Sequence, residues 1–381
     1  MSSNNHATVF ENNRHNLDLV SSLLREGKQI ILPADGQFVR AQAMNFIQYC
    51  PKEYYVAIPN VSMLEHYSHI HKDVVDNLRE YGEKMTEYIT FECPASHRIT
   101  IPDVKETTPV RFTIPKSDTM ITLIYQVMMP LVCIPLYNKQ GLPLLSNQHI
   151  LDMYENTDIH ILKAPEPEVT FPMFPNTVIQ PSNDKESKGH HWRIVEMGFG
   201  KVPSEIVLSK NTQESYPKIR AVPSIDMYLS TPIAGFIPQD AMEKRPELKE
   251  YINYMYDNTM FIDFGRRAEY LKQVVYAYVD LNEEGNTMYA VEELYRVIYK
   301  AYELGIRHVL FHHYIKSVET SDTYYDDLFK KSVLLLTNGR EKVLPVSMEH
   351  MDGFYELQSL ANQVICEDEI IDSDRESADM K

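Results

Sequence analysis

Residues 274–311 read VVYAYVDLNEEGNTMYAVEELYRVIYKAYELGIRHVLF, and this stretch decides the fold class. It opens with a β-branched and aromatic run, Val274 to Val279, which predicts a strand. Residues 287–304 then carry apolar side chains at helical spacing, and Gly305 follows at the position of a helix cap. His308 to Phe311 is again short and apolar. The stretch therefore predicts a strand, a helix and a second strand.

The same alternation continues toward the C-terminus. A second helix is predicted from near Asp322 or Thr323 to the helix-stop pair Asn338-Gly339. Residues 343–346 predict a third strand, and a last helix runs to about Ile365. Alternating strands and helices are typical of a doubly wound, mostly parallel sheet, so the predicted fold class is α/β.

The N-terminal half also has an α/β pattern. Asn16 to Glu26 carries a helical apolar stripe, and Gln29 to Leu32 follows as a short apolar strand. Tyr54 to Ile58 and Tyr88 to Phe91 predict two further strands, with a long polar helix of roughly Val61 to Met85 between them. Two strands separated by such a helix suggest a βαβ crossover. The chain is thus expected to hold two α/β parts.

One apolar stretch raises the question of a membrane span. Met120 to Leu136, MITLIYQVMMPLVCIPL, is almost wholly apolar, but it is shorter than the about 20 residues that a spanning helix needs. It also contains Pro130 and Pro135, which do not fit a regular helix interior. Buried strands broken at proline are the preferred interpretation, and no membrane span is expected.

Prolines suggest where the two parts join. Five of them fall between residues 164 and 190, followed by a polar cluster, and such a segment predicts a linker or a long surface loop. An ordered loop around one large domain is the alternative. The expected organisation is an N-terminal α/β domain, a proline-rich linker or loop, a C-terminal α/β domain and a disordered acidic tail, at residues 1–163, 164–190, 191–365 and 366–381.

Charge and cysteine usage narrow the classes of partner. With 37 Lys and Arg against 54 Asp and Glu, the formal net charge is −17, which argues against a nucleic acid or an anionic membrane as the main partner. The four cysteines are too far apart in sequence for a CxxC metal or redox pair. The polar N-terminus lacks the apolar region of a secretory signal. A cytoplasmic protein with free thiols is expected.

The predicted parallel sheet indicates where a ligand could bind. In open α/β sheets, ligands bind outside the carboxyl ends of the strands, near helix N-termini that favour anions. Three such strand ends bring carboxylates, amides and imidazoles together. The candidate catalytic residues, as base, orienter and ligand contacts, are Asp280, Glu283, His312 and His350. The candidate ligand-binding residues are Asn282, Gly285, Asn286, His313 and Glu349. The expected ligand is a small anionic or nucleotide-like molecule.

Two other interpretations of these residues stay open. The imidazoles and carboxylates could hold a zinc, iron or manganese ion, although the sequence identifies neither a metal nor a cofactor. Alternatively the residues are structural, with His312 and His313 forming a strand end that has one ring buried and one exposed. Asp280 and Glu283 would then belong to a solvated turn.

Two stretches resemble known families. Residues 290–314, AVEELYRVIYKAYELGIRHVLFHHY, are similar to the helix-to-strand step of macrodomains, which implies binding of ADP-ribose. The acidic tail after Ile365 resembles the translocation signals of Legionella type IV secretion effectors, which implies possible transfer into a host cell. The leading hypothesis is therefore an effector-like enzyme that acts on a nucleotide, ADP-ribose or a phosphorylated group at the carboxyl edge of the C-terminal sheet.

Other functional hypotheses come from different classes, and whether the protein is an enzyme is left open. A non-enzymatic regulatory protein could use a tyrosine-rich acidic surface to bind a basic protein partner. A thiol hydrolase could use Cys93, because His97 and Arg98 are close in sequence and could lower the pKa of its thiol.

Overall fold

The structure of the protein is a computed structural model. The residues that it describes are 7–80, 88–154, 157–165, 174–182, 192–202, 216–217, 219, 222, 224–231, 236–237, 246–313, 322–344 and 346–347. The chain forms two compact units. The first comprises residues 1–223 with 291–299 and 320–332, and the second comprises residues 224–290, 300–319 and 333–381.

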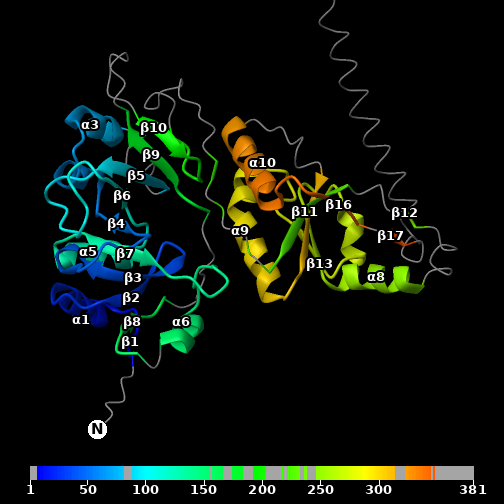
Figure 1. The fold of residues 1–381 in the computed structure, drawn as a ribbon, viewed down its shortest axis with the longest axis horizontal. Coiled ribbons are helices and arrows are strands. Elements are labelled where there is room, and N and C mark those ends of the chain that lie inside the picture. The colour runs from blue at the N-terminus through cyan, green and yellow to red at the C-terminus, as the bar shows by residue number, and fades with distance from the viewer. Residues whose placement is uncertain are drawn as a thin grey trace, which may run out of the picture. The chain divides into compact units, whose positions relative to one another are not determined.

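The first unit is built on a ten-stranded mixed sheet (Figure 1). The strands in chain order are β1 (Thr8–Phe10), β2 (Ile30–Ala34), β3 (Gln37–Ala43), β4 (Tyr55–Ala57), β5 (Ile89–Pro94), β6 (Pro109–Thr113), β7 (Leu131–Pro135), β8 (His160–Leu162), β9 (Thr177–Pro181) and β10 (Trp192–Glu196). Their order across the sheet is β1-β8-β2-β3-β7-β4-β6-β5-β9-β10. The helices of this part are α1 (Arg14–Arg25), α2 (Leu64–Tyr67), α3 (Lys72–Glu80), α5 (Asp118–Val127) and α6 (Asn147–Tyr154), with 3-10 turns at Met44–Phe46 and Val61–Met63.

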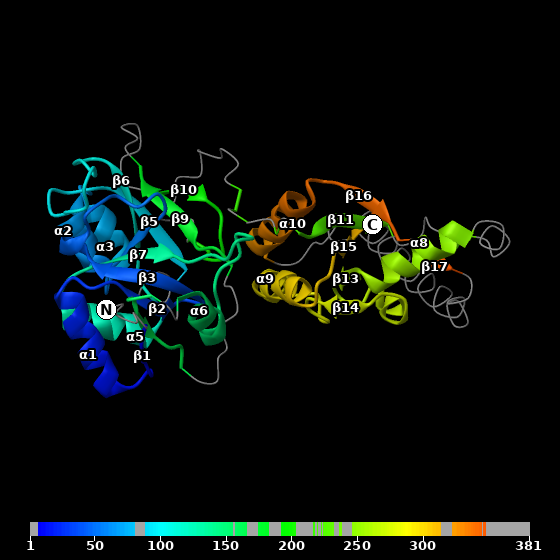
Figure 2. The same ribbon diagram turned by 60° about the horizontal axis from the view of Figure 1, so that its bottom comes forward.

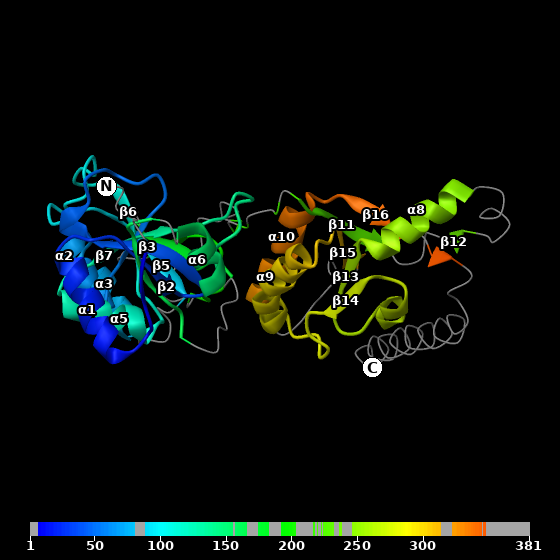
Figure 3. The ribbon, with the colours of Figure 1, turned by 90° about the horizontal axis from the view of Figure 1, so that it is seen from below.

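Side-chain alternation in the strands decides which helix covers which face. In β2, Leu32 points into a hydrophobic cluster formed with α1 and α5, whereas Ile31 belongs to a cluster that contains Ile150 of α6. Helices α1 and α5 lie side by side on their face (Figure 3). Further along the sheet, α3 contributes Val75 and Leu78 to a third cluster, which also holds Phe91 of β5. The sheet is therefore the middle layer of this unit.

A tight hairpin joins β2 to β3. Ala34 pairs with Gln37, and the two residues between them, Asp35 and Gly36, both have positive φ angles of 46° and 84°. Positive φ at both central positions matches a type I′ turn, for which Asp-Gly is a preferred pair. The Asp35 carboxylate also accepts the backbone N–H of Lys116 at 2.8 Å. This turn ties the β2–β3 hairpin to the segment that leads into α5.

The second unit contains a five-stranded sheet in which every strand pair is parallel (Figure 2). The strands are β11 (Asp226–Thr231), β13 (Thr259–Asp263), β14 (Ala277–Asp280), β15 (His308–His312) and β16 (Glu341–Val343), in the order β14-β13-β15-β11-β16. A separate pair is formed by β12 (Phe236–Ile237) and β17 (Val346–Ser347). The helical segments between the strands are α8 (Pro246–Asp257), a 3-10 turn (Glu269–Gln273), α9 (Thr287–Glu303) and α10 (Thr323–Thr337). The predicted α/β fold with a parallel C-terminal sheet is confirmed.

Helix α9 follows the sequence prediction closely. Asn286 is its N-cap, and the Asn286 side chain accepts the backbone N–H of Met288. Gly305 follows the C-cap with φ 69°, a conformation that favours glycine. Strand β14, however, begins at Ala277 and not at Val274, because Glu269–Gln273 form a 3-10 turn in which Val274 donates its N–H to Leu271.

The predicted βαβ crossover in the N-terminal half is wrong. Strand β6 pairs parallel with β4 and antiparallel with β5, so β4 and β5 run in opposite directions on its two sides. The predicted long helix is also interrupted between α2 and α3, where Ser68 forms an isolated antiparallel bridge with Ala95. A residue in an extended bridge cannot continue a helix, so periodicity alone overestimated the length of this element. Residues 81–87, at its predicted end, lie outside the described residues.

The apolar stretch at 120–136 is a helix followed by a strand, not strands alone. Met120, Leu123, Ile124 and Val127 of α5 are buried at helical spacing, and Met128 ends the helix with φ 58°. Because apolar residues occur on nearly every side of this helix, the apolar positions in its sequence show no clear period of 3.6 residues. Among the described residues, no helix is both long enough and apolar enough to cross a membrane.

The proline-rich stretch contains a regular element that the sequence did not predict. Strand β9 pairs parallel with β5 and antiparallel with β10, so β10 belongs to the first sheet although residues 191–365 were expected to form the second domain. Pro181 ends β9, which is compatible with its missing N–H. The predicted last helix and the acidic tail lie within 348–381, outside the described residues.

We predict that Trp192→Ala lowers the free energy of unfolding of the first unit by about 3–5 kcal/mol. Trp192 is fully buried, its indole N–H donates to the Val74 carbonyl at 3.2 Å, and its ring meets the Phe91 ring edge-on. Differential scanning calorimetry measures the effect. Tyr125→Ala, at a 57 % exposed position on α5, is the matched control. A loss below about 1 kcal/mol would contradict the placement of β10 in this core.

Candidate functional site

One end of the ten-stranded sheet carries a polar face. Ala57 of β4 belongs to the cluster under α1 and α5, and it pairs with Thr113 of β6, so the two side chains lie on the same face. From Thr113 outward, that face changes from apolar to polar. The side chains found there are Thr90, Glu92, Arg111, Thr113, Gln180, Arg193 and Glu196, together with the buried Val178. We call this set the polar face.

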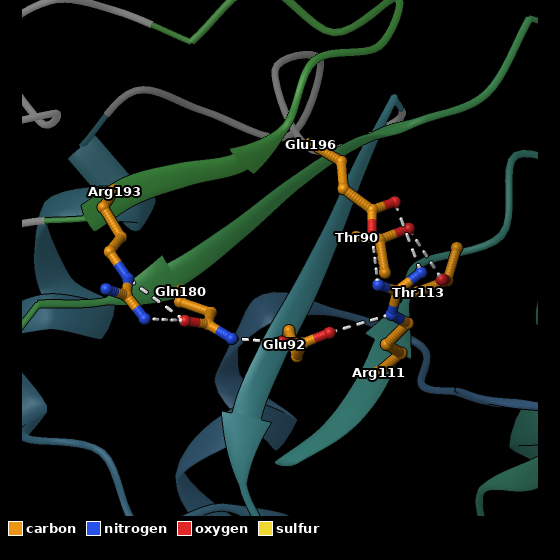
Figure 4. A network of polar contacts seen from close by, with 7 residues as sticks. All are labelled: Thr90, Glu92, Arg111, Thr113, Gln180, Arg193 and Glu196. Carbon is orange, nitrogen blue, oxygen red and sulfur yellow. Dashed lines mark hydrogen bonds and ion pairs between the residues drawn. The ribbon is translucent and has the colours of Figure 1, made fainter. Parts of the chain in front are cut away.

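Arg111 is paired with two carboxylates of the polar face (Figure 4). Its Nε donates to Glu92 Oε2 at 2.9 Å, and its Nη2 donates to Glu196 Oε1 at 2.6 Å. A second contact, from Nη1 to Glu196 Oε2 at 3.5 Å, makes the ion pair with Glu196 bidentate. One guanidinium from β6 thus links carboxylates from β5 and β10.

These three charges are largely shielded from solvent. The exposed fractions of the side chains are 31 % for Arg111, 16 % for Glu92 and 14 % for Glu196. Burial by itself lowers the pKa of Arg111, but the hydrogen bonds and charges of Glu196 and then Glu92 outweigh it and raise the pKa. The guanidinium therefore stays charged.

Amide and hydroxyl groups extend the network on both sides of Arg111 (Figure 4). Gln180 donates to Glu92 and accepts from Arg193 Nε at 3.1 Å, which connects a second, exposed guanidinium. On the other side, the hydroxyls of Thr90 and Thr113 lie 3.3 Å apart. The face can therefore offer both carboxylate acceptors and guanidinium donors to a small ligand.

Sequence reasoning missed this site. Glu92, Arg111 and Glu196 are far apart in the chain, and only strand pairing brings them together. The usable signal was the alternation of polar and apolar residues in Thr90–Cys93 and Val110–Thr113, which is typical of strands with one buried and one polar face.

The carboxyl edge of the second sheet brings part of the predicted site together. Asp280 ends β14 beside Asp263 of β13, and its carboxylate accepts the backbone N–H groups of Gly265 at 3.3 Å and Asn282 at 2.9 Å, besides that of Arg266. Burial raises the pKa of Asp280, and the charge of Asp263 adds to this, while the backbone hydrogen bonds act in the opposite direction. Asp280 thus joins the two loops that follow β13 and β14.

The other predicted residues of the β14–α9 loop are engaged with one another. Asn282 accepts the N–H of Gly285 through its carbonyl at 3.0 Å and that of Asn286 through its side chain at 2.7 Å. Glu283 forms an exposed ion pair with Arg266. In this arrangement the N–H groups of Gly285 and Asn286 stabilise the loop itself.

The two imidazoles at the end of β15 differ in exposure. His312 is 1 % exposed and meets the Phe261 ring edge-on, whereas His313 is half-buried with its Nε2 3.9 Å from Glu341 Oε1. Burial, together with the positive charges of Arg267 and His313, lowers the pKa of His312 to about 3. His312 is therefore neutral at pH 7.

Two further predictions concern metal and thiol chemistry. Glu349 and His350 lie outside the described residues, and among the residues that are described there is no cluster of three metal-ligating side chains. Cys93 lies in the core under α3, where burial and the charge of Glu92 raise the pKa of its thiol well above the usual range. A buried neutral thiol does not suit the nucleophile expected for a thiol hydrolase.

The two sheets define a two-part α/β protein, with a mixed ten-stranded sheet followed by a parallel five-stranded one. No family model and no curated protein matches the chain. Among solved structures, it is similar to Sua5 from P. abyssi complexed with L-threonine, with a TM-score of 0.57 and 12 % identity over 89 % of this chain and 99 % of that one. A double mutant of P. abyssi Sua5 gives a TM-score of 0.56 and 12 % identity, covering 90 % and 98 %. The protein has a Sua5-like fold.

This likeness corrects the resemblances suggested by the sequence. The macrodomain and type IV effector interpretations are wrong, because the similarity to Sua5 extends over both sheets and nearly the whole chain. The macrodomain resemblance rested on one helix leading into one buried strand, α9 and β15, and that step occurs in parallel α/β sheets in general. Without these two resemblances, neither binding of ADP-ribose nor transfer into a host cell is supported.

We predict that the second unit loses stability as the pH falls from about 6.5 toward 3, in part because of His312. Its folded pKa of about 3 lies below the ordinary histidine value, so in this window the unfolded chain binds more protons and acid favours unfolding. His312→Gln should flatten the pH dependence in urea unfolding at pH 7 and 5, whereas His313→Gln should change it less. An unchanged slope in His312→Gln would refute the assignment.

Proposed function

We propose that the protein is an enzyme of Sua5 type, and that its first unit binds a small α-amino acid of the L-threonine kind on the polar face. The observation that carries the proposal is the arrangement of Glu92, Arg111 and Glu196 on one face of the first sheet. The fold is shared with a Sua5 that was crystallised with L-threonine, and this supports the choice of ligand.

The charges of the polar face match those of an amino acid. An α-ammonium group needs anionic acceptors, which the carboxylates of Glu92 and Glu196 supply. An α-carboxylate needs a planar donor pair, for which a guanidinium is well suited, and both Arg111 and Arg193 lie on this face. Thr90 and Thr113 add hydroxyls that can both donate to and accept from a side-chain hydroxyl of the ligand. Low exposure of the carboxylates strengthens each of these interactions.

We predict that L-threonine binds to the wild-type chain and that Glu196→Gln weakens this binding about tenfold or more, since one charge-assisted hydrogen bond is lost. Isothermal titration calorimetry measures the affinity. Glu11→Gln is the matched control, because Glu11 forms an exposed ion pair with Lys163 in the same unit, 2.7 Å long. N-acetyl-L-threonine, which lacks the ammonium group, should not compete. Equal affinities for the two variants would overturn the placement of the ligand.

The nucleotide-like ligand expected from the sequence stays a proposal for the carboxyl edge of the second sheet. Its support is the all-parallel sheet, whose carboxyl edge is the usual ligand side. Because Gly285 and Asn286 use their N–H groups within the loop, a phosphate there would be held by the exposed Arg266, which would exchange Glu283 for the ligand.

We predict that Arg266→Gln weakens binding of adenosine triphosphate about tenfold, and that Arg340→Gln does not. Arg340 is also exposed and ion-paired, but its partner Asp226 begins β11 at the opposite edge of the sheet. Fluorescence polarisation with a labelled nucleotide measures both. If both variants bind as the wild type does, the nucleotide does not use this edge.

A further inference from the structure

A cavity of about 360 Å³ lies in the first unit, away from the polar face. It is bounded by the residues that enter β2 and β8, by the end of β3, and by the segment 46–51. The strands of the polar face, β5, β6, β9 and β10, contribute none of its lining. The volume lies within the range that suits a small molecule.

Close packing of an aromatic ring on backbone shapes one wall of the cavity. Gly27 has φ 83°, and a Cβ atom built there would lie only 2.6 Å from the ring of Phe46. Glycine at this position therefore lets the Phe46 ring rest directly on the chain. Ile134 and Ile159 contribute further apolar surface to the lining. These groups give the cavity an apolar wall against which the C–H face of a ligand can pack.

Polar groups enter the cavity from several sides. Gln42 donates to the Gly27 carbonyl at 2.7 Å and accepts from Gln29 Nε2 at 3.3 Å, so these two amides are held in fixed orientations. Gln48 lies on the segment opposite them, and His160 enters from β8. Amide and imidazole groups can each donate and accept hydrogen bonds. The lining is thus suited to groups, such as hydroxyls, that do both.

The charges around the cavity balance. Lys28 and Asp158 are both exposed residues of its lining and carry opposite signs. Burial and then the charge of Lys28 lower the pKa of His160, although Asp158 opposes this, so the imidazole is neutral at pH 7. The lining therefore has no net charge that would favour binding of a cation or of an anion.

His160 is half-buried and lines the cavity, so its imidazole ring can meet a ligand there. Its Nδ1 is enclosed by protein atoms, so the contact falls to the rest of the ring.

We propose that this cavity binds an uncharged polyhydroxyl ligand of monosaccharide size. The fixed amides of Gln29 and Gln42 and the imidazole of His160 bond its hydroxyls, and the wall at Phe46 packs against its C–H face. The proposal is independent of the amino-acid ligand on the polar face, because the two sites share no residue.

Saturation-transfer NMR on the full chain tests the proposal with glucose, galactose, mannose, ribose and myo-inositol at about 20 mM, a concentration suited to millimolar affinities. At least one of the five should bind, and His160→Phe should weaken that binding about tenfold. Phenylalanine keeps the ring that meets Phe10, whose centroid is 6.2 Å from that of His160, and removes both nitrogens.

His308→Phe is the matched control, because the ring of His308 in β15 also lies against an aromatic ring, that of Tyr254, but in the second unit. It should bind the sugar as the wild type does. Failure of all five ligands, or equal weakening by both variants, would overturn the proposal. A preference for charged glucuronate or glucosamine over glucose would overturn the neutral character assigned to the cavity. L-Threonine titrations of His160→Phe should stay at the wild-type value, which separates this test from that of the proposed function.

Discussion

The ion pairs of Arg111 are the interaction on which the polar end of the first sheet depends. Glu92 and Glu196 come from strands that are not neighbours, and both carboxylates are more than four-fifths buried. Without the guanidinium between them they would repel each other, and removing one partner of a buried ion pair costs about 3–5 kcal/mol. The same contacts hold β6, β5 and β10 in a fixed relation. The strand order at this end and the chemistry of its surface are therefore coupled.

The alternating segment from β14 through α9 and β15 to α10 could be predicted from the sequence, because its signals are local. Strands β13 and β11, which lie between β14, β15 and β16 in the sheet, were not among the predicted elements. Helix α9 has an amphipathic stripe, an asparagine N-cap and a glycine after its C-cap, and all three act within a few residues of one another. A parallel strand that is buried on both faces has a short run of apolar residues in its sequence. Strand β15 is an example, with Val309 to Phe311 at its centre. The role of Asp280 at the carboxyl edge was less accessible, since its hydrogen bonds to Gly265 and Arg266 depend on how two loops meet.

The first unit resisted prediction because its organisation is non-local. Strands β4 and β5 were expected to be parallel, yet they lie on either side of β6 and run in opposite directions. The prolines near β9 suggested an irregular segment, although a proline at the end of a strand removes no hydrogen bond that the sheet needs. The polar face of this sheet was missed for the same reason. Its alternating residues are visible in sequence, but which strands lie beside one another is not.

The position of Trp192 has a spectroscopic consequence. It is the single tryptophan among 381 residues, and it is fully enclosed between β10 and α3 in the first unit. An indole in an apolar core emits at shorter wavelength than one in water, so the tryptophan emission of this protein reports on one sheet only. The 25 tyrosines, which occur in both units, report on the whole chain. Selective excitation of the indole thus allows the first unit to be followed by itself without adding any label.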